Sequence, residues 1–563
     1  MAVQIQKLYR RISTQYPVIT LTLAAYPKRS WLWLLFLVGI AIGSSIFLIL
    51  ESLQRGEFIS ALSARDSDRF WTALLRFVLV LLASGGLLTL RQLIRDRIAL
   101  HWRTSLTKAV LDNYLSEKNL LKIQNQTQID NPDQRITEDI KLITIQSLNI
   151  FVIAIESTVQ LIGFVFIIWQ VSRSLTIALI LYAAIGSGLV SLVFGRRLAF
   201  INEEQLKREA SLRGGLIRLD ENAEAIAFYR GEAREERIID TLFAAVLSNY
   251  RRLINWQLGL DFFQFGFGYL GLILPSLLLA SAILSGAMEV GVIAQSQAAF
   301  DRVWLSLSLI VLQFETLTTL AASHRRFTQM VNQMQLDTPE NIAVSHQSDH
   351  GIHITDLTLR TQAGRSLVQD LSLQIPLHSN LLITGESGVG KSTLAKAIVG
   401  VWNCGEGQIH GIKEGSIFVL PQEPYLTLGS LKDQLLYPNL KSPCTDAELM
   451  SVLEKSGLHK LSVADLDQPE DWSKRLSKGE KQRLSCARIL LRAPDCVILD
   501  EATSALTRQQ EQHFYQSLLE QKITVISIGH RPSLLPFHQR VLQLNTNQSW
   551  SVHPAESYQF GAS

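Results

Sequence analysis

Apolar stretches of membrane-spanning length recur along the chain and stop near residue 322. A helix that crosses the hydrocarbon core of a bilayer needs about 20 consecutive apolar residues. Five stretches of this kind are separated by polar segments, and a sixth is less regular because Asp301 and Arg302 fall inside it. We therefore predict six membrane-spanning helices, over residues 31–50, 70–90, 150–171, 175–195, 258–284 and 297–319.

Two long polar segments, residues 91–149 and 196–257, divide these stretches into pairs. They have helical patterning and few helix breakers, so we expect them to extend the membrane helices into the cytosol. Basic residues accumulate on the cytosolic side of a membrane. The first 30 residues contain no acid and five basic residues, which are Lys7, Arg10, Arg11, Lys28 and Arg29. Both termini and both long segments are therefore predicted to be cytosolic, although a signal peptide or transit peptide is an alternative interpretation of the start.

Each long segment contains a polar cluster at a turn-prone place, one at residues 131–139 and one at residues 222–232. In the first cluster, Pro132 is suited to open a helix behind an Asn131 cap. Either cluster is a solvated helix–turn–helix or a short transverse helix that docks on another domain. The candidate coupling residues are Asn131, Asp133, Arg135, Glu224, Phe228 and Tyr229.

Several charged residues fall inside the predicted spans, where ionisable groups are expensive and tend to face a cavity or a partner. Glu156 lies deepest and is the candidate for contact with substrate or a proton, and Arg76 is a second candidate cavity residue. The alternative is that some of these groups lie at the membrane interface or pair with one another to hold helices together. That alternative is favoured for the charges near span ends, which are Asp261, Asp301 and Arg302.

Composition separates this membrane half from the rest of the chain. The 563 residues are 47% hydrophobic with a mean hydropathy of +0.17, but the apolar excess lies in a transmembrane domain over residues 1–335. A linker over residues 336–350 leads to a soluble α/β domain over residues 351–563. The net charge of +3 argues against a nucleic-acid partner. All four cysteines lie in the soluble domain without metal-binding spacing, which favours reduced structural thiols in the cytosol.

A phosphate-binding loop is the strongest motif of the soluble domain. Residues 385–393 fit the pattern G-x-x-x-x-G-K-[ST], between an apolar strand at residues 381–384 and a helix at residues 394–399. Glycines allow the backbone to bend around phosphate, lysine supplies charge and serine offers a hydroxyl to Mg²⁺. The predicted nucleotide-binding residues are Gly385, Glu386, Ser387, Gly388, Val389, Gly390, Lys391, Ser392 and Thr393.

Further candidate site residues follow this loop in order. An apolar run over residues 497–499 ends in Asp500 and Glu501, which suits a central parallel strand with acids at its carboxyl end. Asp500 is placed to hold Mg²⁺ with Ser392, and Glu501 to act as the general base. Gln422 is a candidate contact to the metal and the attacking water, and His530 to the γ-phosphate.

The segment 476–483 opens a helix with serine and glycine, an arrangement that offers N–H groups to an anion. A P-loop kinase or small GTPase would not carry this segment. The segment has a role if two such domains bind ATP between them. The phosphate loop of each domain would then face Ser477, Gly479 and Glu480 of the other.

Together these motifs resemble the nucleotide-binding domain of an ABC transporter. With six preceding spans, the chain resembles a half-transporter of the exporter-type fold. Residues 131–135, 224–229 and 529–531 resemble the subfamily-D branch, which includes peroxisomal acyl-CoA and cobalamin transporters and bacterial relatives that carry peptides, cobalamin or fatty acids. The resemblance implies ATP and Mg²⁺ as cofactors, a lipid bilayer, and a second copy or homologous half-transporter as partner, with the homodimer favoured.

Three positions depart from the family pattern. Lys478 replaces a glycine of the signature and either adds charge beside the partner's phosphate or strains the turn. Thr507 replaces an aspartate, which weakens an expectation of communication between the two sites. Thr361 stands where an aromatic residue commonly stacks on adenine.

The predicted function is ATP-driven transport of an amphipathic or lipid-like substrate by alternating access, in a bacterial plasma membrane. Fatty acid, acyl-CoA, cobalamin and peptide remain open as substrates, as does the direction of transport. The alternative is a membrane-anchored ATPase that acts as a nucleotide-controlled channel or regulator without pumping.

Overall fold

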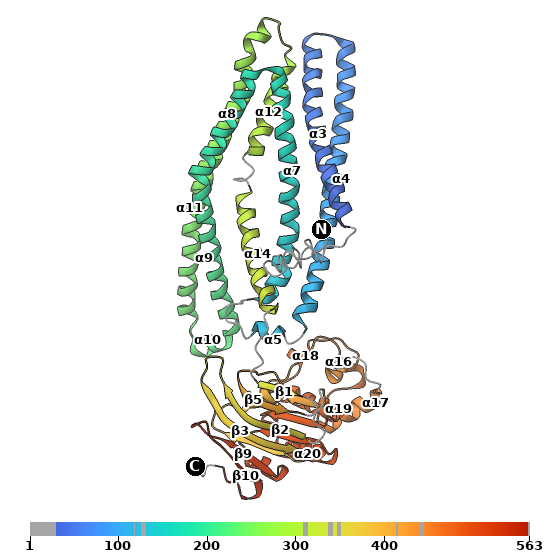
Figure 1. Ribbon diagram of the computed structural model, residues 1–563, viewed down its shortest axis with the longest axis vertical. Coiled ribbons are helices and arrows are strands. Elements are labelled where there is room, and N and C mark those ends of the chain that lie inside the picture. The colour runs from blue at the N-terminus through green and yellow to red at the C-terminus, as the bar shows by residue number, and fades with distance from the viewer. Residues whose placement is uncertain are drawn as a thin grey trace, which may run out of the picture. The chain divides into compact units, whose positions relative to one another are not determined.

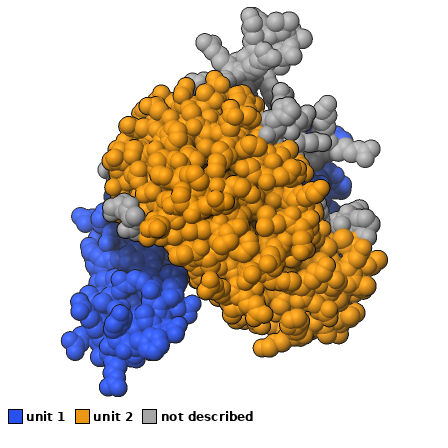
Figure 2. All heavy atoms as spheres, turned by 90° about the horizontal axis from the view of Figure 1, so that it is seen from below, with its two compact units in different colours: residues 1–336 blue, residues 337–563 orange. Residues whose placement is uncertain are grey.

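The computed structural model describes residues 30–116, 119–124, 131–307, 313–335, 342–345, 351–411, 415–438 and 444–560. The chain divides into two compact units, Met1–Leu336 and Asp337–Ser563, which are drawn in two colours in Figure 2. The basic start and most of the predicted linker lie outside the described residues.

The first unit is entirely helical where it is described (Figure 1). The long helices α3, α4, α7, α8, α9, α11, α12 and α14 are joined by short helices and two π-helical stretches. Their bounds are α3 Ser30–Ser63, α4 Ser67–Tyr114, α5 Asn119–Gln124, α6 Pro132–Gln134, η1 Arg135–Asp139, α7 Ile140–Val171, α8 Arg173–Leu189, η2 Val190–Gly195, α9 Arg196–Glu221, α10 Ala223–Tyr229, α11 Glu232–Leu284, α12 Gly291–Leu307 and α14 Phe314–Gln335.

Within the described ranges, five helices are long and apolar enough to cross a membrane. They contain the first five predicted spans. The sixth predicted span falls on α12 and α14, and residues 308–312 between these helices lie outside the described part. Several helices continue well beyond the membrane-spanning length, as the helical patterning predicted. The 48 residues of α4, for example, correspond to about 72 Å at 1.5 Å per residue.

The polar cluster at residues 131–139 differs from both sequence interpretations. It is neither a solvated turn nor a separate transverse helix, because α6 and η1 run directly into α7. Asn131 occupies the N-cap position in a left-handed conformation, with φ of 43°, but its side chain makes no capping hydrogen bond. Asn131 and Asp133 are exposed, whereas Arg135 and Asp139 are buried.

Long-range contacts with α14 explain this burial. The Arg326 guanidinium binds both oxygens of the Asp139 carboxylate, with Nε–Oδ2 at 3.0 Å. Arg135 Nη1 donates to the carbonyl oxygen of Arg326 at 2.8 Å. These polar contacts lie beside an apolar cluster formed by α4, α5, α7 and α14. Arg135 therefore holds the helices of its own unit together.

The second polar cluster contains a short helix, α10, between the long helices α9 and α11. A short helix therefore stands where the sequence allowed a plain turn or a transverse helix, and docking of α10 on another domain stays a prediction. Its residues are largely exposed, and Phe228 and Tyr229 leave 78% and 87% of their surface accessible.

The second unit combines two β-sheets with helices. A four-stranded sheet has the order β1-β5-β2-β3, and a six-stranded sheet has the order β10-β9-β4-β8-β7-β6. The strands are β1 Ile342–Ser345, β2 Gly351–Arg360, β3 Ser366–Pro376, β4 Leu381–Gly385, β5 Gly405–His410, β6 Ile417–Leu420, β7 Cys496–Asp500, β8 Thr524–Ile528, β9 Arg540–Leu544 and β10 Trp550–Pro554. The helices are α15 Lys391–Ile398, α16 Leu431–Leu436, α17 Asp446–Lys455, α18 Trp472–Arg475, α19 Lys478–Arg492 and α20 Arg508–Glu520, and short 3₁₀ turns are η3 Val463–Asp465, η4 Pro532–Phe537 and η5 Ala555–Ser557.

Five strands of the larger sheet run parallel, because β4 pairs in parallel with β8 and β9, and β7 with β6 and β8. Both faces of this sheet are covered, so its strands are apolar along their whole length. Alternate residues enter two cores. Ile383, Ile498 and Ile526 pack with the smaller sheet and α15, whereas Leu382 and Val497 pack with α19 and α20.

A buried chain of hydrogen bonds joins α20, β8 and η4 behind this sheet. His538 Nδ1 donates to the carbonyl oxygen of Leu534 at 2.7 Å, so Nε2 accepts from the Ser527 hydroxyl at 2.9 Å. The Tyr515 hydroxyl in turn donates to Ser527 Oγ at 2.8 Å. Burial lowers the pKa of His538 to about 4, so the folded protein keeps this imidazole neutral.

A pH dependence of stability follows from His538. Because the unfolded chain takes up a proton near pH 6.5 and the folded chain only near pH 4, folding stability falls as the pH falls through this window. Between pH 7 and pH 5 the loss should be about 2 kcal/mol. We expect this loss in the urea unfolding of the purified protein and not in His538→Gln. An equal pH dependence in the two proteins would contradict the assignment.

Candidate functional site

The phosphate loop has the strand–turn–helix context that the sequence predicted. It leaves β4 at Gly385 and enters α15 at Lys391, three residues before the predicted helix. Gly385 has φ of 144°, and a Cβ there would lie 2.2 Å from the carbonyl oxygen of Leu544 on the neighbouring strand. Only glycine allows the chain to turn at this position.

Lys391 lies at the bottom of this loop with 7% of its surface accessible. Its ammonium donates to the carbonyl oxygens of Gly385 and Glu386 at 2.8 and 2.7 Å. Burial lowers the pKa of Lys391, and the negative charges of Glu501 and Asp500 oppose this shift. The lysine charge is therefore held inside the loop, with backbone carbonyls as its partners.

Oxygen atoms suited to a magnesium ion meet beside the loop. The Ser392 hydroxyl donates to Asp500 Oδ1 at 3.1 Å, across 108 residues of sequence. Burial raises the pKa of Asp500, an effect that the Ser392 hydrogen bond opposes. Hydroxyl, carboxylate and amide oxygens are the hard ligands that Mg²⁺ prefers. Ser392, Asp500 and the amide of Gln422 thus fit the predicted donor set.

Glu501 stands at the point where the remaining predicted residues converge. It follows β7 in a left-handed conformation with φ of 49°, and its N–H donates to the carbonyl oxygen of Ile528 at 3.1 Å. Gln422 Nε2 donates to Glu501 Oε2 at 3.1 Å. His530 Nε2 lies 3.8 Å from Glu501 Oε1. The structure therefore brings together the candidate base and both of its predicted neighbours.

The signature segment is a capped helix start. Ser477 is the N-cap of α19, and Glu480 accepts hydrogen bonds from the Ser477 N–H and hydroxyl at 2.9 and 2.7 Å. The hydrogen bonds from Ser477 lower the pKa of Glu480. Lys478 is the first residue of the helix, and its side chain is exposed. Its φ is not positive, so the turn accommodates this departure without backbone strain.

The other two departures also have local partners. Thr507 is the N-cap of α20 and forms a capping box with Gln510. Thr361 begins the turn between β2 and β3, where its hydroxyl accepts from the N–H of Arg365 at 3.1 Å. Each threonine thus stabilises a local element in place of the side chain that the family pattern has there.

Sequence reasoning missed a network that joins α19 to the segments after β7 and β8. The side chain of Gln482 accepts from the N–H of Ala505 at 2.9 Å and donates to Ser504 Oγ at 3.3 Å. Arg531 Nη2 donates to the carbonyl oxygen of Ser504 at 2.6 Å. The fully buried carboxylate of Glu511 accepts from Thr503 Oγ1 at 2.7 Å. The sequence signal that could have revealed this network was Glu511, a charged residue on the otherwise apolar face of α20.

Comparison with known proteins decides the family. Residues 20–284 match the family "ABC transporter transmembrane region 2", and residues 368–504 match the family "ABC transporter". An uncharacterized ABC transporter ATP-binding protein of Synechocystis is 36% identical over 88% of this chain and 77% of that relative. The chain belongs to the ABC transporter family.

This ABC transporter is homologous to the D subfamily. The chloroplastic ABC transporter D family member 2 of Arabidopsis thaliana is 33% identical over 89% of this chain and 82% of that protein. A bacterial Atm1-family ABC exporter with ATP bound has the same fold, with a TM-score of 0.74 at 18% identity, over 94% of this chain and 95% of that one. One transmembrane region and one ATPase domain make the chain a half-transporter, which binds ATP and couples its hydrolysis to transport across a lipid bilayer.

Glu156, the predicted substrate contact in the membrane, is engaged within its own unit. It forms an ion pair with Arg91 and accepts from the Ser44 hydroxyl at 3.2 Å. These contacts connect α7 with α4 and α3, and both charged side chains are less than one-fifth exposed. This pair matches the alternative in which charged groups hold helices together, and a role for Glu156 in substrate contact stays a prediction.

The other charges of the predicted spans lie at the surface of the first unit or near it. Arg76 is exposed on α4, and Asp261 accepts from Gln257 at 3.2 Å on α11. Asp301 is exposed on α12, and the neighbouring Arg302 is half-buried. The structure does not bring these residues together with Glu156.

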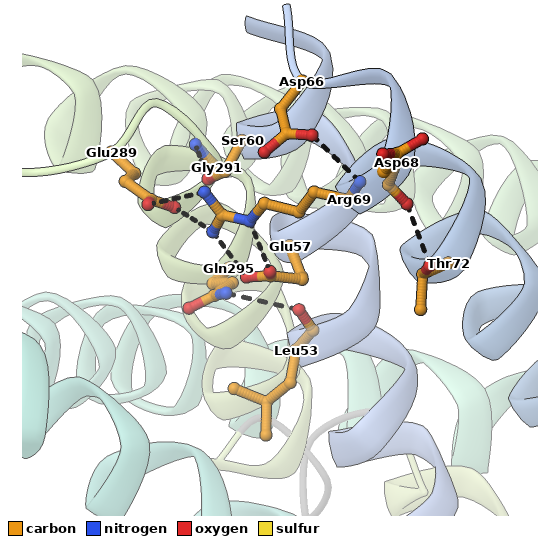
Figure 3. A network of polar contacts seen from close by, with 10 residues as sticks. All are labelled: Leu53, Glu57, Ser60, Asp66, Asp68, Arg69, Thr72, Glu289, Gly291 and Gln295. Atoms are coloured by element: carbon orange, nitrogen blue, oxygen red, sulfur yellow. Dashed lines mark hydrogen bonds and ion pairs between the residues drawn. The ribbon is translucent and has the colours of Figure 1, made fainter. Parts of the chain in front are cut away.

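A more extensive charged network ties the turn between α3 and α4 to the segment between α11 and α12 (Figure 3). The Arg69 guanidinium binds both oxygens of Glu57, at 2.8 and 3.1 Å, and both oxygens of Glu289, at 3.0 and 2.8 Å. Beside it, Gly291 N–H donates to Ser60 Oγ at 3.1 Å. A Cβ at Gly291 would lie 1.9 Å from the carbonyl oxygen of Gly56, so the backbones of the two segments are in direct contact.

Replacement of Glu501 by Gln tests the catalytic assignment. The amide keeps the shape and the Gln422 contact but cannot accept a proton, so steady-state ATP hydrolysis should fall by about 10²–10⁴-fold. Nucleotide affinity should be retained. Lys391→Ala is the comparison variant, because it removes the charge in the phosphate loop and should weaken ATP binding itself. Undiminished turnover by Glu501→Gln would refute the role of Glu501.

Proposed function

We propose that the chain works as a homodimer that hydrolyses ATP at two shared sites and uses the cycle to move an amphipathic or lipid-like substrate across a membrane. The observation that carries this proposal is the convergence of Lys391, Ser392, Asp500 and Glu501 at one edge of the parallel sheet. Gln422 and His530 complete this group.

In the ATP-bound state, the ammonium of Lys391 exchanges its carbonyl partners for the β- and γ-phosphates. Residues 385–390 and Thr393 complete the nucleotide cradle around it. Ser392, Asp500 and Gln422 hold Mg²⁺, which neutralises charge on the phosphates when bound. Glu501 orients the attacking water and accepts its proton, while His530 contacts the γ-phosphate and Gln422 keeps the glutamate in place.

The partner copy completes each site with Ser477, Gly479 and Glu480. The N–H groups at the start of α19 supply donors to an anion, because a helix start carries unpaired N–H groups and a partial positive charge. Ser477 contributes its hydroxyl when that group exchanges Glu480 for the anion. The exposed position of Lys478 supports an added positive charge where the two copies meet at the ATP site. The capping of α19 by Ser477 supports a rigid helix start.

Movement passes to the membrane helices through α10 and the segment that begins α7. The exposed side chains of Phe228 and Tyr229 support a docking role for α10, together with Glu224. At the other segment, the exposed Asn131 and Asp133 are the contact residues, and the buried Arg135 fixes their helix to α14. Alternating access of a cavity between the two copies follows from this coupling.

The host membrane is proposed to be a bacterial plasma membrane, with both termini in the cytosol. Fatty acid, acyl-CoA, cobalamin and peptide are the substrate classes to be compared. Lys478 begins α19 without backbone strain and Thr507 caps α20, which supports a pump over the alternative channel or regulator.

Sealed vesicles that contain the purified protein test the proposal. With Mg²⁺ and ATP outside, the wild type should move one member of the substrate panel uphill, either into the vesicles or out of preloaded vesicles, because hydrolysis supplies the energy for uphill movement. Glu501→Gln, present in the same amount, should not. A protein that only accelerates equilibration, equally in both variants, would be a channel and would contradict the proposal.

A further inference from the structure

A cavity of about 250 Å³ lies within the first unit, between α3, α8, α11 and α12. Two opposite charges line it, Arg55 on α3 and Asp301 on α12. Its walls also include Tyr182 and Trp304, two aromatic residues, and Gly268 on α11. This combination of charge and aromatic surface is distinct from the ATP site and belongs to the membrane half.

Arg55 and Asp301 do not form an ion pair with each other. Both side chains are exposed, and neither has an ion pair or a side-chain hydrogen bond among the residues that the structure describes. Glu57 and Glu289, two acids of the segments next to Arg55 and α12, are both bound to Arg69. Charged groups in a membrane domain tend to face a cavity, a ligand path or a partner.

The offset along α12 between Asp301 and the level of Arg55 sets a minimum length for a ligand that would bridge them. Gln295 donates to the carbonyl oxygen of Leu53 at 3.3 Å, which places this turn of α12 beside the Arg55 level of α3. Asp301 follows Gln295 by six residues, or about 9 Å along the helix axis at 1.5 Å per residue. An extended chain of three amino-acid residues reaches about 10 Å.

The cavity wall between the two charged residues is apolar, and its aromatic rings pack against one another. Tyr182 stacks on Phe267 with ring centroids 4.3 Å apart, and Trp304 lies 5.0 Å from Phe267. The Tyr182 hydroxyl donates to the carbonyl oxygen of Phe267 at 2.6 Å, so its polar group is already used. Tyr182 and Trp304 are largely buried, with 8% and 6% of their surface accessible, so they offer the cavity a small and rigid apolar surface.

The α11 side of the cavity is opened by small residues. A Cβ at Gly268 would meet no atom within 4 Å, so this position is empty space that a side chain can occupy. Close by, Gln297 Nε2 donates to the carbonyl oxygen of Leu272 at 3.0 Å and to Ser276 Oγ at 3.2 Å. This amide is therefore engaged with helix α11 around Pro275, and Arg55 and Asp301 are left as the charged contacts for a ligand.

We propose that this cavity binds a small zwitterion with an apolar body, whose anionic end meets Arg55 and whose ammonium end meets Asp301. The site deepens the proposed transport function and rests on it, because it defines the substrate class by charge at both ends. Arg55 and Asp301 act as specificity-determining residues. Trp304 and Tyr182 hold the apolar body.

The test uses tri-leucine with free termini as the probe, and the full-length protein in lipid nanodiscs without nucleotide. Its binding is measured by calorimetry against empty nanodiscs. Acetylation of the amino end and amidation of the carboxyl end should each weaken binding to the wild type by about tenfold or more, because each removes one charge-assisted contact.

Two variants assign each end of the probe. Asp301→Asn should bind the free and the acetylated peptides equally while still discriminating against the amidated one. Arg55→Gln should show the reverse pattern. The assignment of charges is wrong if acetylation and amidation change peptide binding to both variants as much as they change binding to the wild type. It is also wrong if neither modification changes binding to the wild type.

Gly268→Val provides a test that leaves the charges in place. The added side chain points into empty space, so the helix should fold, but it fills the cavity and should abolish tri-leucine binding. Gly266→Val is the matched control, because its Cβ also meets no atom within 4 Å and Gly266 does not line the cavity. Equal binding by both valine variants would place the ligand elsewhere.

ATP hydrolysis by the same preparations separates this inference from the proposed function. Wild-type protein that hydrolyses ATP and pumps another substrate without binding tri-leucine would overturn the zwitterion site and leave the transporter intact. Binding of tri-leucine with the predicted dependence on Arg55 and Asp301 would support the site even in a preparation that does not pump.

Discussion

Parallel pairing of four neighbouring strands is the constraint on which the ATP site depends. β4, β8, β7 and β6 are adjacent in the sheet and point the same way. The segments that follow them carry, in this order, the phosphate loop, His530, the acids Asp500 and Glu501, and Gln422. Because the carboxyl ends of parallel strands meet at one edge, residues separated by more than 100 positions become neighbours. The two buried cores on either side of the sheet hold this edge in place.

The same constraint explains why the ATP site could be predicted well from the sequence. Each motif is local, and the apolar runs before it indicated the strand that positions it. The loop geometry at Gly385, the Ser392–Asp500 contact and the Gln422–Glu501 contact agree with that expectation. The membrane-spanning helices were predictable for a related reason, since span length follows from bilayer thickness. The D-subfamily resemblance is confirmed by the homology to a plant family member.

Features that depend on distant residues could not be predicted. The segment at residues 131–139 is drawn into α7 by Arg326, nearly 190 positions away, and no local pattern announces that contact. Glu156 looked isolated in its span, yet Arg91 of another helix binds it. Conversely, Asp301 was expected to pair or to lie at the interface, and the structure instead places it in a cavity with Arg55. The effect of Lys478 could not be predicted, because it depended on the backbone conformation at that position. The structure has an ordinary helix start there.

The account as a whole requires that one copy's phosphate loop lies against the other copy's signature helix. Disulfide crosslinking tests this contact most directly, in a background without native cysteines and with Glu501→Gln to retain ATP. Two differently tagged chains would be co-expressed, one with Ser387→Cys and the other with Lys478→Cys. The account predicts an ATP-dependent crosslink between the two tags, which disappears when Lys474→Cys, at an exposed position of the neighbouring helix α18, replaces Lys478→Cys. Absence of any crosslink between chains under ATP would contradict it.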